Sequence, residues 1–203
     1  MKEVIGVAKQ ARALRTHDRV LDAAAYQFAR FGYADTNLQH IADRIGLTKG
    51  ALYGHFSSKE ELAAALTEHL SLGVRALLDM ARTSSGPALS RLEALVLGLG
   101  ELFRTDRRAQ AALRLEVEAA RAAGSVAPVL TETHEVALQL VGEAQRAGLW
   151  DDTLPTDPLA DLIMAALFTA FWASADSDRG RPGPSLPALW DVLARTLGTG
   201  VTA

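Results

Sequence analysis

The sequence predicts an all-α protein, with a small N-terminal domain followed by a larger helical domain. Alternating β-branched runs are missing, whereas Ala, Leu, Arg and Glu are abundant and apolar residues recur at intervals near 3.6. Glycines and Pro-containing segments interrupt this pattern where helices would end. A chain of 203 residues is long enough for one or two domains with a proper core.

The chain opens with a short arm and a first helix. Residues 1–11 are expected to form a flexible basic arm. The first strong helix is expected from about Thr16 to Phe31, because apolar residues three and four positions apart give it a continuous stripe. Gly32 follows this stripe and is well suited to end the helix.

Two short helices are expected next. Thr36 with Gln39 three residues later matches a capping box and predicts a short helix over 37–45, which ends at Gly46. Thr48 can then cap a second short helix of barely two turns. Two short helices joined by a tight turn that contains Gly are typical of a helix-turn-helix.

A longer helix follows this pair. Ser58 and Glu61 repeat the capping box and predict a helix from Lys59 to about Leu70. We expect residues 12–58 to form the helix-turn-helix domain and residues 59–203 the second domain, with helix 59–70 as the link.

The stretch LTKGALYGHF, residues 47–56, has an apolar side and a polar side when it is read as a helix. Leu47, Leu52 and Phe56 can point inward. The side chains and backbone left outward belong to Thr48, Lys49, Gly50, Tyr53 and His55. Each of them alone is also compatible with a turn or a half-buried core aromatic, but together they form a polar face in a locally basic segment.

The outward face has chemistry suited to duplex DNA. Hydroxyl and imidazole groups donate to phosphate oxygens, and Lys49 adds charge and can reach a guanine edge. Gly50 has no side chain, so the backbone there can approach the duplex closely. Lys59 stands at a helix start, where a phosphate is favoured, and Thr36 and Asn37 could bind a phosphate from the other side.

The charge distribution agrees with a DNA-facing end. Residues 1–60 hold nine Lys and Arg against six Asp and Glu, whereas residues 61–203 hold twelve against eighteen. The formal net charge of −3 therefore hides a basic N-terminal region on an acidic body.

The segment GYADTNLQHIADRIGLTKGALYGHFSSKEELAAAL, residues 32–66, resembles the DNA-binding domain of the TetR family of bacterial transcriptional regulators. The resemblance covers about residues 12–70, and the stretches AKQARALRTHDRVLDAAA and TKGALYGHFSSKEELA further resemble the γ-butyrolactone-type autoregulator receptors of actinomycetes. It implies DNA contacts at these positions: Thr36 or Asn37, Thr48, Lys49, Gly50, Tyr53, His55 and Lys59. One position departs from the family pattern, because Gly54 stands where a large side chain is common. We therefore expect this helix to make fewer contacts with DNA bases than is usual in the family.

The remaining chain predicts helices near 71–82, 88–104, 106–123, 126–147, 157–175 and 185–198. The family resemblance implies a helical bundle that binds a small ligand and forms a homodimer through its last long helices. We assign dimerisation mainly to the helices near 126–147 and 185–198, although their apolar stripes could equally face the core of their own subunit. The loop-like segment 176–185 is the one most suited to disorder.

A ligand pocket in this bundle would be mainly apolar and aromatic, with a few polar groups. The candidates are Phe103, Gln110, Leu113, Arg114, Val117, Trp150, Phe168, Phe171 and Trp172. The branch resemblance implies a small, mostly apolar ligand with a lactone-like head, and a drug or a pathway intermediate fits such a cavity equally well. The resulting hypothesis is a repressor that releases a near-palindromic operator of double-stranded DNA when a small-molecule effector binds.

Other function classes receive less support. The absence of Cys excludes disulfides and thiolate metal sites, and we expect no metal site and no cofactor. The apolar run LIMAALFTAFWA (162–173) is too short for a membrane span, so a cytoplasmic protein is expected. Glu132, His134 and Glu135 cluster, but a second His is missing from the helical spacing that metal binding needs, so a non-enzyme is favoured. A small all-α enzyme and a helical interaction module that does not bind DNA remain the alternatives.

Overall fold

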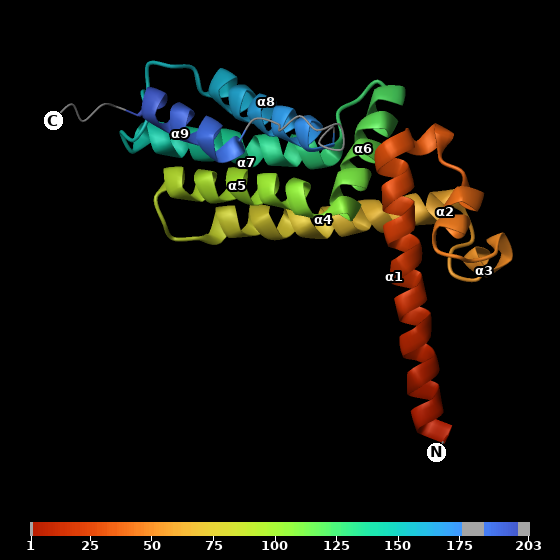
Figure 1. Cartoon of the computed structure of the whole chain (residues 1–203). Helices are drawn as coiled ribbons and strands as arrows, with labels where there is room; N and C mark the ends of the chain where they lie inside the picture. Colours follow the sequence, from red (N-terminus) through yellow and green to blue (C-terminus); the bar gives the residue numbers. More distant parts are fainter. Residues whose placement is uncertain (1, 176–184, 199–203) are drawn as a thin grey trace. The chain divides into compact units, whose positions relative to one another are not determined.

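The computed structural model describes residues 2–175 and 185–198, and this part of the chain folds as helices joined by short connections (Figure 1). The helices are α1 (Lys2–Asp35), α2 (Leu38–Arg44), α3 (Lys49–Tyr53), α4 (Lys59–Thr83), α5 (Ala88–Thr105), α6 (Arg107–Ala122), α7 (Pro128–Arg146), α8 (Thr156–Ala175) and α9 (Leu186–Leu197). The only β-type pairing within these ranges is a single antiparallel bridge between Trp150 and Gly198. The all-α prediction is confirmed.

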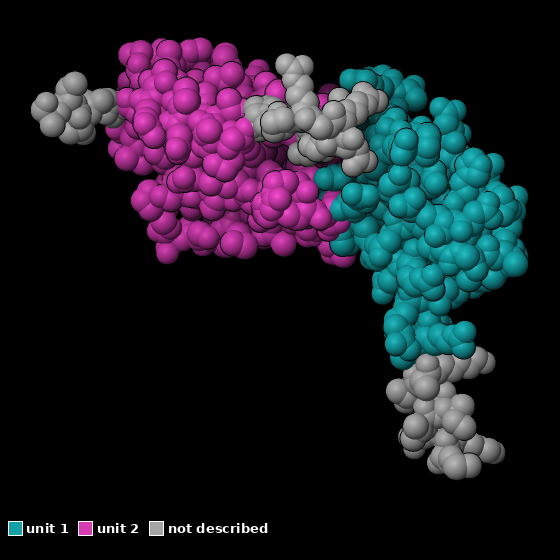
Figure 2. Space-filling model, viewed as in Figure 1, with its two compact units in different colours: residues 1–70, 107–124 teal, residues 71–106, 125–203 magenta. Residues whose placement is uncertain are grey.

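The chain divides into two compact units, but the division differs from the expected one (Figure 2). Unit 1 holds residues 1–70 and 107–124, and unit 2 holds residues 71–106 and 125–203. The difference arises because α4 continues without a break past Leu70 and because α6 returns to pack on α1. Residues 2–11 of the expected flexible arm 1–11 form the start of α1, and residues 176–184 of the predicted loop 176–185 lie outside the described residues.

Helix α6 belongs to unit 1 because its polar side chains bind α1 at two places. Near the middle of α1, Arg108 donates to Asp22 at 2.7 Å and approaches Asp18 at 3.4 Å. Near the end of α1, Arg114 donates to the carbonyl oxygen of Ala29 at 2.7 Å. These partners are 85 or more positions apart in sequence, so amphipathic periodicity gave no indication of the pairing.

A kink at Gly32 interrupts α1 just before its end. The glycine has φ of +74° and ψ of −175°, a conformation that L side chains rarely adopt. Glu118 of α6 occupies the space beside it, and its Oε2 accepts a hydrogen bond from the backbone N–H of Tyr33 at 2.9 Å. The predicted helix end at Gly32 is therefore a real change of direction, after which one more helical turn follows.

Unit 2 packs α5, α7, α8, α9 and the second half of α4 around an apolar core. The rings of Phe103 and Phe171 meet edge to face at 5.5 Å. Trp150 is fully buried, and its ring lies 6.1 Å from that of Trp190. None of the helices in the described ranges is long and apolar enough to cross a membrane.

The apolar stripe of α7 faces the core of its own unit. Val136, Leu140 and Val141 are 2%, 1% and 0% exposed. The prediction that the helix near 126–147 offers these residues to a second subunit is therefore wrong, because side chains already enclosed in the monomer cannot form an intersubunit surface.

Candidate nucleic-acid interface

The start of α2 is capped one residue later than the sequence predicts. Asn37 is the N-cap, and its Oδ1 accepts a hydrogen bond from the N–H of Gln39 at 2.8 Å. Thr36 is buried instead, and its hydroxyl donates to the carbonyl oxygen of Gly32 at 2.6 Å. Thr36 as a DNA contact is therefore a wrong prediction for its side chain, whereas the exposed Asn37 stays available.

A tight turn joins α2 to α3. Gly46 has φ of +69°, its N–H donates to the carbonyl of Asp43, and the N–H of Leu47 donates to the carbonyl of Ala42. This is the Schellman arrangement, which a residue with positive φ completes most easily when it is glycine. Arg19 of α1 donates to the carbonyl oxygen of Ile45 at 2.9 Å and so fixes the turn to the first helix.

Helix α3 is anchored by its own Leu52 and by Phe56, which follows the helix. Leu52 and Phe56 are 0% and 2% exposed, and the ring of His17 stacks on that of Phe56 at 4.3 Å. The hydroxyl of Thr48 accepts a hydrogen bond from the N–H of Ala51 at 3.1 Å and caps the helix as predicted. The short helix thus gains its stability from packing, since five residues alone would not stay helical in water.

The polar face of α3 is open to solvent. Thr48, Lys49 and Gly50 are exposed, Tyr53 is 44% exposed, and His55 is half-buried. The Lys49 Nζ lies 5.9 Å from the centre of the Tyr53 ring. The backbone at Gly50 has open space where a Cβ would be. The polar face that the sequence predicts for α3 is therefore accessible, and its contact with DNA stays a prediction.

Gly54 ends α3 in an ordinary right-handed conformation. Its φ is −72°, and a Cβ added there would lie 3.3 Å from the carbonyl oxygen of Ala51. The conformation of Gly54 is one that other residues also adopt. Glycine at this position therefore matters for the surface beside Tyr53, which lacks a side chain there.

The Lys59 side chain is directed into unit 1. Its Nζ donates to three carbonyl oxygens at the end of α1, those of Tyr33 at 2.7 Å, Ala34 at 3.3 Å and Thr36 at 3.1 Å. The same Nζ lies 4.5 Å from the Tyr33 ring centre. The structure does not support Lys59 as a phosphate contact, because the N–H donors of its ammonium group already face three backbone carbonyl oxygens.

The start of α4 is capped by the predicted pair Ser58 and Glu61 and also by Ser57, which was not predicted from the sequence. The Ser58 hydroxyl accepts from the N–H of Glu61 at 3.1 Å. The carboxylate of Glu61 accepts from the N–H and the hydroxyl of Ser57. These hydrogen bonds, the Ser57 hydroxyl first, hold the pKa of Glu61 below its ordinary value. The two consecutive serines before the helix, Ser57 and Ser58, are the feature of the sequence that could have predicted this second contact.

The predicted ligand-binding residues fall into separate groups. Phe103, Phe171 and Trp172 meet in unit 2, with rings 5.5 Å and 5.2 Å apart along the series. Trp150 lies against Trp190 instead, and Phe168 is half-buried on α8. The candidates on α6 are assigned to unit 1: Gln110, Leu113, Arg114 and Val117. Among them, Arg114 is engaged by Glu118 at 2.7 Å and by Ala29.

A model of the tetR family of bacterial regulatory proteins matches residues 20–66, which include the whole helix-turn-helix. The A-factor receptor protein of Streptomyces griseus is 47% identical over 62 residues, which is 30% of this chain and 22% of that protein. The match thus spans less than a quarter of that relative's own length.

Two solved structures are similar over nearly the whole chain. A crystal structure described as a gamma-butyrolactone receptor and ArpA-like protein has 29% identity and a TM-score of 0.71, and covers 93% of this chain and 90% of that one. CprB of Streptomyces coelicolor, a TetR family protein studied in complex with its biological operator sequence, has 31% identity and a TM-score of 0.73. The CprB match covers 94% of this chain and 92% of that one. This chain therefore belongs to the TetR family of bacterial regulatory proteins.

Proposed function

We propose that this protein is a cytoplasmic transcriptional repressor that binds an operator through α3 and releases it when a small molecule binds unit 2. The observation that carries the proposal is the exposed face of Thr48, Lys49, Gly50 and Tyr53 on a helix anchored by Leu52. A helix presented in this way enters the major groove, with polar side chains toward phosphates and base edges. The operator complex of the similar protein CprB supports this assignment.

The effector site is proposed in unit 2, around Phe103 and Phe171. Both side chains are nearly buried, at 7% and 3% exposure, and Trp172 extends the aromatic series to the surface. Small, mostly apolar molecules bind at sites lined by aromatic and aliphatic side chains. The likeness to a gamma-butyrolactone receptor favours a lactone-like effector, and a drug or pathway intermediate is the second candidate.

A homodimer is proposed to bind the two halves of the operator, with α8 and α9 at its interface. The outer side of α8 exposes a stripe formed by Leu162, Ala165, Thr169 and Trp172. On α9, Val192 is 63% exposed although Trp190 is buried. A helix that is apolar on its inner and outer sides is typical of one covered by a partner.

The alternative of an enzyme receives no support from the acidic cluster on α7. Glu132 accepts a hydrogen bond from Arg82 at 3.3 Å, and His134 lies 3.1 Å from Asp161. These contacts lie along helix surfaces and give Glu132 and His134 a structural role.

The decisive experiment measures binding of the purified protein to the DNA that flanks its own gene, by fluorescence anisotropy over a range of salt concentrations. We expect the protein to prefer the flanking sequence, and we expect the logarithm of its binding constant to fall linearly with the logarithm of the salt concentration. Addition of a synthetic γ-butyrolactone should then release the DNA. Binding that is equal on flanking and scrambled DNA would overturn the repressor, whereas operator binding unaffected by any lactone would exclude only that effector.

A further inference from the structure

Three arginine side chains gather around the phenol ring of Tyr26 on the surface of unit 1. Arg44 at the end of α2 lies over the Tyr26 ring, with its Cζ 3.4 Å from the ring centre. Arg107, the first residue of α6, lies 5.7 Å from the same centre. Arg30 donates to the Tyr26 hydroxyl at 2.9 Å. Three helices that are distant in sequence thus bring their cationic groups to one place.

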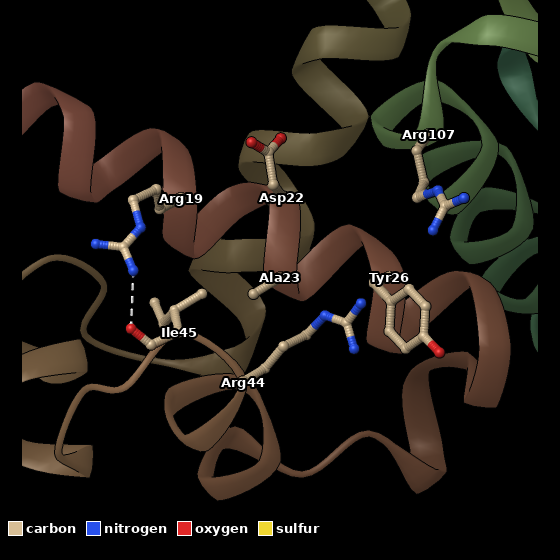
Figure 3. A pocket seen from close by; sticks show the side chains of 7 residues that line it. All are labelled: Arg19, Asp22, Ala23, Tyr26, Arg44, Ile45 and Arg107. Carbon is tan, nitrogen blue, oxygen red and sulfur yellow. Dashed lines mark hydrogen bonds between the residues drawn. The ribbon is translucent and has the colours of Figure 1, made fainter.

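Arg44 and Arg107, together with Arg19, border a depression of about 330 Å³ (Figure 3). Its lining consists of Arg19, Asp22, Ala23, Tyr26, Arg44, Ile45 and Arg107. Figure 3 shows the guanidinium groups of Arg44 and Arg107 directed toward the Tyr26 ring, the first from α2 and the second from α6. This volume is at the lower end of the range for small-molecule sites and exceeds what a single phosphate group needs.

The positive charge in this depression is not neutralised by the described residues. The one acidic residue of the lining, Asp22, is already paired with Arg108 at 2.7 Å. Arg19, Arg44 and Arg107 form no ion pair with any carboxylate in the described ranges. Arg19 donates to the carbonyl of Ile45, and the guanidinium groups of Arg44 and Arg107 lie near the ring of Tyr26.

Unpaired guanidinium groups that converge on one depression repel each other, and a bound anion relieves that repulsion. Guanidinium presents a planar fork of N–H donors that matches the oxygens of a phosphate group. The Tyr26 hydroxyl offers one further donor at the rim, and its ring offers a flat face. From this arrangement we infer that the depression between α1, α2 and α6 is a binding site for a phosphate group.

Two sources can supply this group. One is a soluble phosphorylated molecule that occupies the depression by itself, and the other is the sugar-phosphate backbone of DNA beside the recognition helix. Arg19 and Arg44 flank the turn at Gly46 that leads into α3, so an occupant from either source would bear on the orientation of that helix.

The test compares the double variant R44Q/R107Q with a control, R75Q/R121Q, which removes the same charge from exposed arginines outside the depression. Calorimetric titration with inorganic pyrophosphate, without DNA, examines the soluble source. We expect saturable binding by the wild type and the control, and binding weakened by roughly tenfold or more in R44Q/R107Q.

The DNA source is examined with operator DNA at several salt concentrations. If pyrophosphate does not bind, we expect the slope of log affinity against log salt to fall by about two units in R44Q/R107Q and to stay unchanged in the control. The inference is overturned if R44Q/R107Q behaves as the wild type in both assays, or if the control loses as much.

Thermal unfolding shows whether loss of the Arg44 contact with Tyr26 has disturbed the fold. The single variant R107Q keeps that contact and gives a second reading, with a smaller loss of pyrophosphate affinity or a slope lower by about one unit. Operator binding by the wild type tests the repressor separately, so the two proposals can fail independently.

Discussion

The carboxylate of Glu118 on α6 holds the backbone N–H of Tyr33 on α1 at 2.9 Å, immediately after the kink at Gly32. Arg114 donates to the other oxygen of the same carboxylate at 2.7 Å and to the carbonyl of Ala29 at 2.7 Å. One pair of side chains thus satisfies backbone groups on both sides of the kink. The connection from α1 into the helix-turn-helix is therefore fixed by a helix that follows it by about 85 residues.

This contact makes the replacement Gly32→Ala costly. A Cβ at position 32 would lie 2.5 Å from Glu118 Oε1, so the carboxylate would have to move and lose its hydrogen bond, in addition to the strain of positive φ. Gly124→Ala is the matched control, because φ is +67° there and no atom lies within 4 Å. In urea unfolding we expect G124A to cost about 1 kcal/mol and G32A at least about 1 kcal/mol more. Equal losses would show that Glu118 moves aside freely.

Lys49 and Lys59 should separate DNA binding from stability. We expect Lys49→Gln to lower the salt slope of operator binding by about one unit with an unchanged melting temperature, because its side chain is exposed and makes no backbone contact. Lys59→Gln should instead lower the melting temperature and leave the slope intact, because it removes donors from three carbonyl oxygens. A lower slope in K59Q without loss of stability would restore Lys59 as a phosphate contact.

Charge on the outer sides of α8 and α9 should dissociate the proposed dimer. Val192→Glu and Leu162→Glu each place a carboxylate at a position that is 63% or 46% exposed in the single chain. We expect sedimentation to show monomers and operator affinity to fall, because burial of an unpaired charge opposes association. Val126→Glu is the control, since Val126 is 66% exposed in the connection before α7. Dimers that persist in both variants would place the interface elsewhere.

Acid should weaken unit 1 partly through Glu61. Hydrogen bonds from Ser57 lower the pKa of Glu61 in the folded protein, so its contribution to stability is present above the ordinary glutamate pKa and is lost as pH falls through the lowered value. We therefore expect Glu61→Gln to reduce stability near neutral pH and to flatten its decline between about pH 5 and pH 3. Urea midpoints at several pH values measure this, with Glu68→Gln, an exposed change later in α4, as the comparison. An unchanged pH profile in E61Q would show that the Ser57 contacts do not persist in solution.

The sequence predicted the helices well because their signals are local. Apolar spacing, the Thr48 cap and the Gly46 turn all act within a few residues, and each appears where expected. The cap of α2 moved from Thr36 to Asn37 because both residues can cap a helix. Because the Thr36 hydroxyl donates to the Gly32 carbonyl at the kink, Thr36 is not the N-cap, and Asn37 caps α2 instead.

Long-range packing decided what periodicity could not. An amphipathic helix has one apolar side whether it packs on α1 or on the helices of unit 2, so the sequence held no local signal that α6 belongs to unit 1. The same ambiguity led to α7 being assigned to a subunit interface. The sequence also does not show where a flexible Lys side chain will point. Lys59 donates to backbone carbonyl oxygens of Tyr33 and Thr36, whose positions depend on the kink at Gly32.

Helix α4 passes from unit 1 to unit 2 without a loop, since Lys59–Thr83 is a single run of 25 residues. Each residue of an α-helix turns the chain by about 100°. Insertion of one residue near Ser71 would therefore rotate the part of α4 after it by about 100° about the helix axis relative to Lys59–Leu70, because no loop is present to take up the extra residue. A loop between domains absorbs such length changes, whereas this junction tolerates substitutions far better than insertions or deletions.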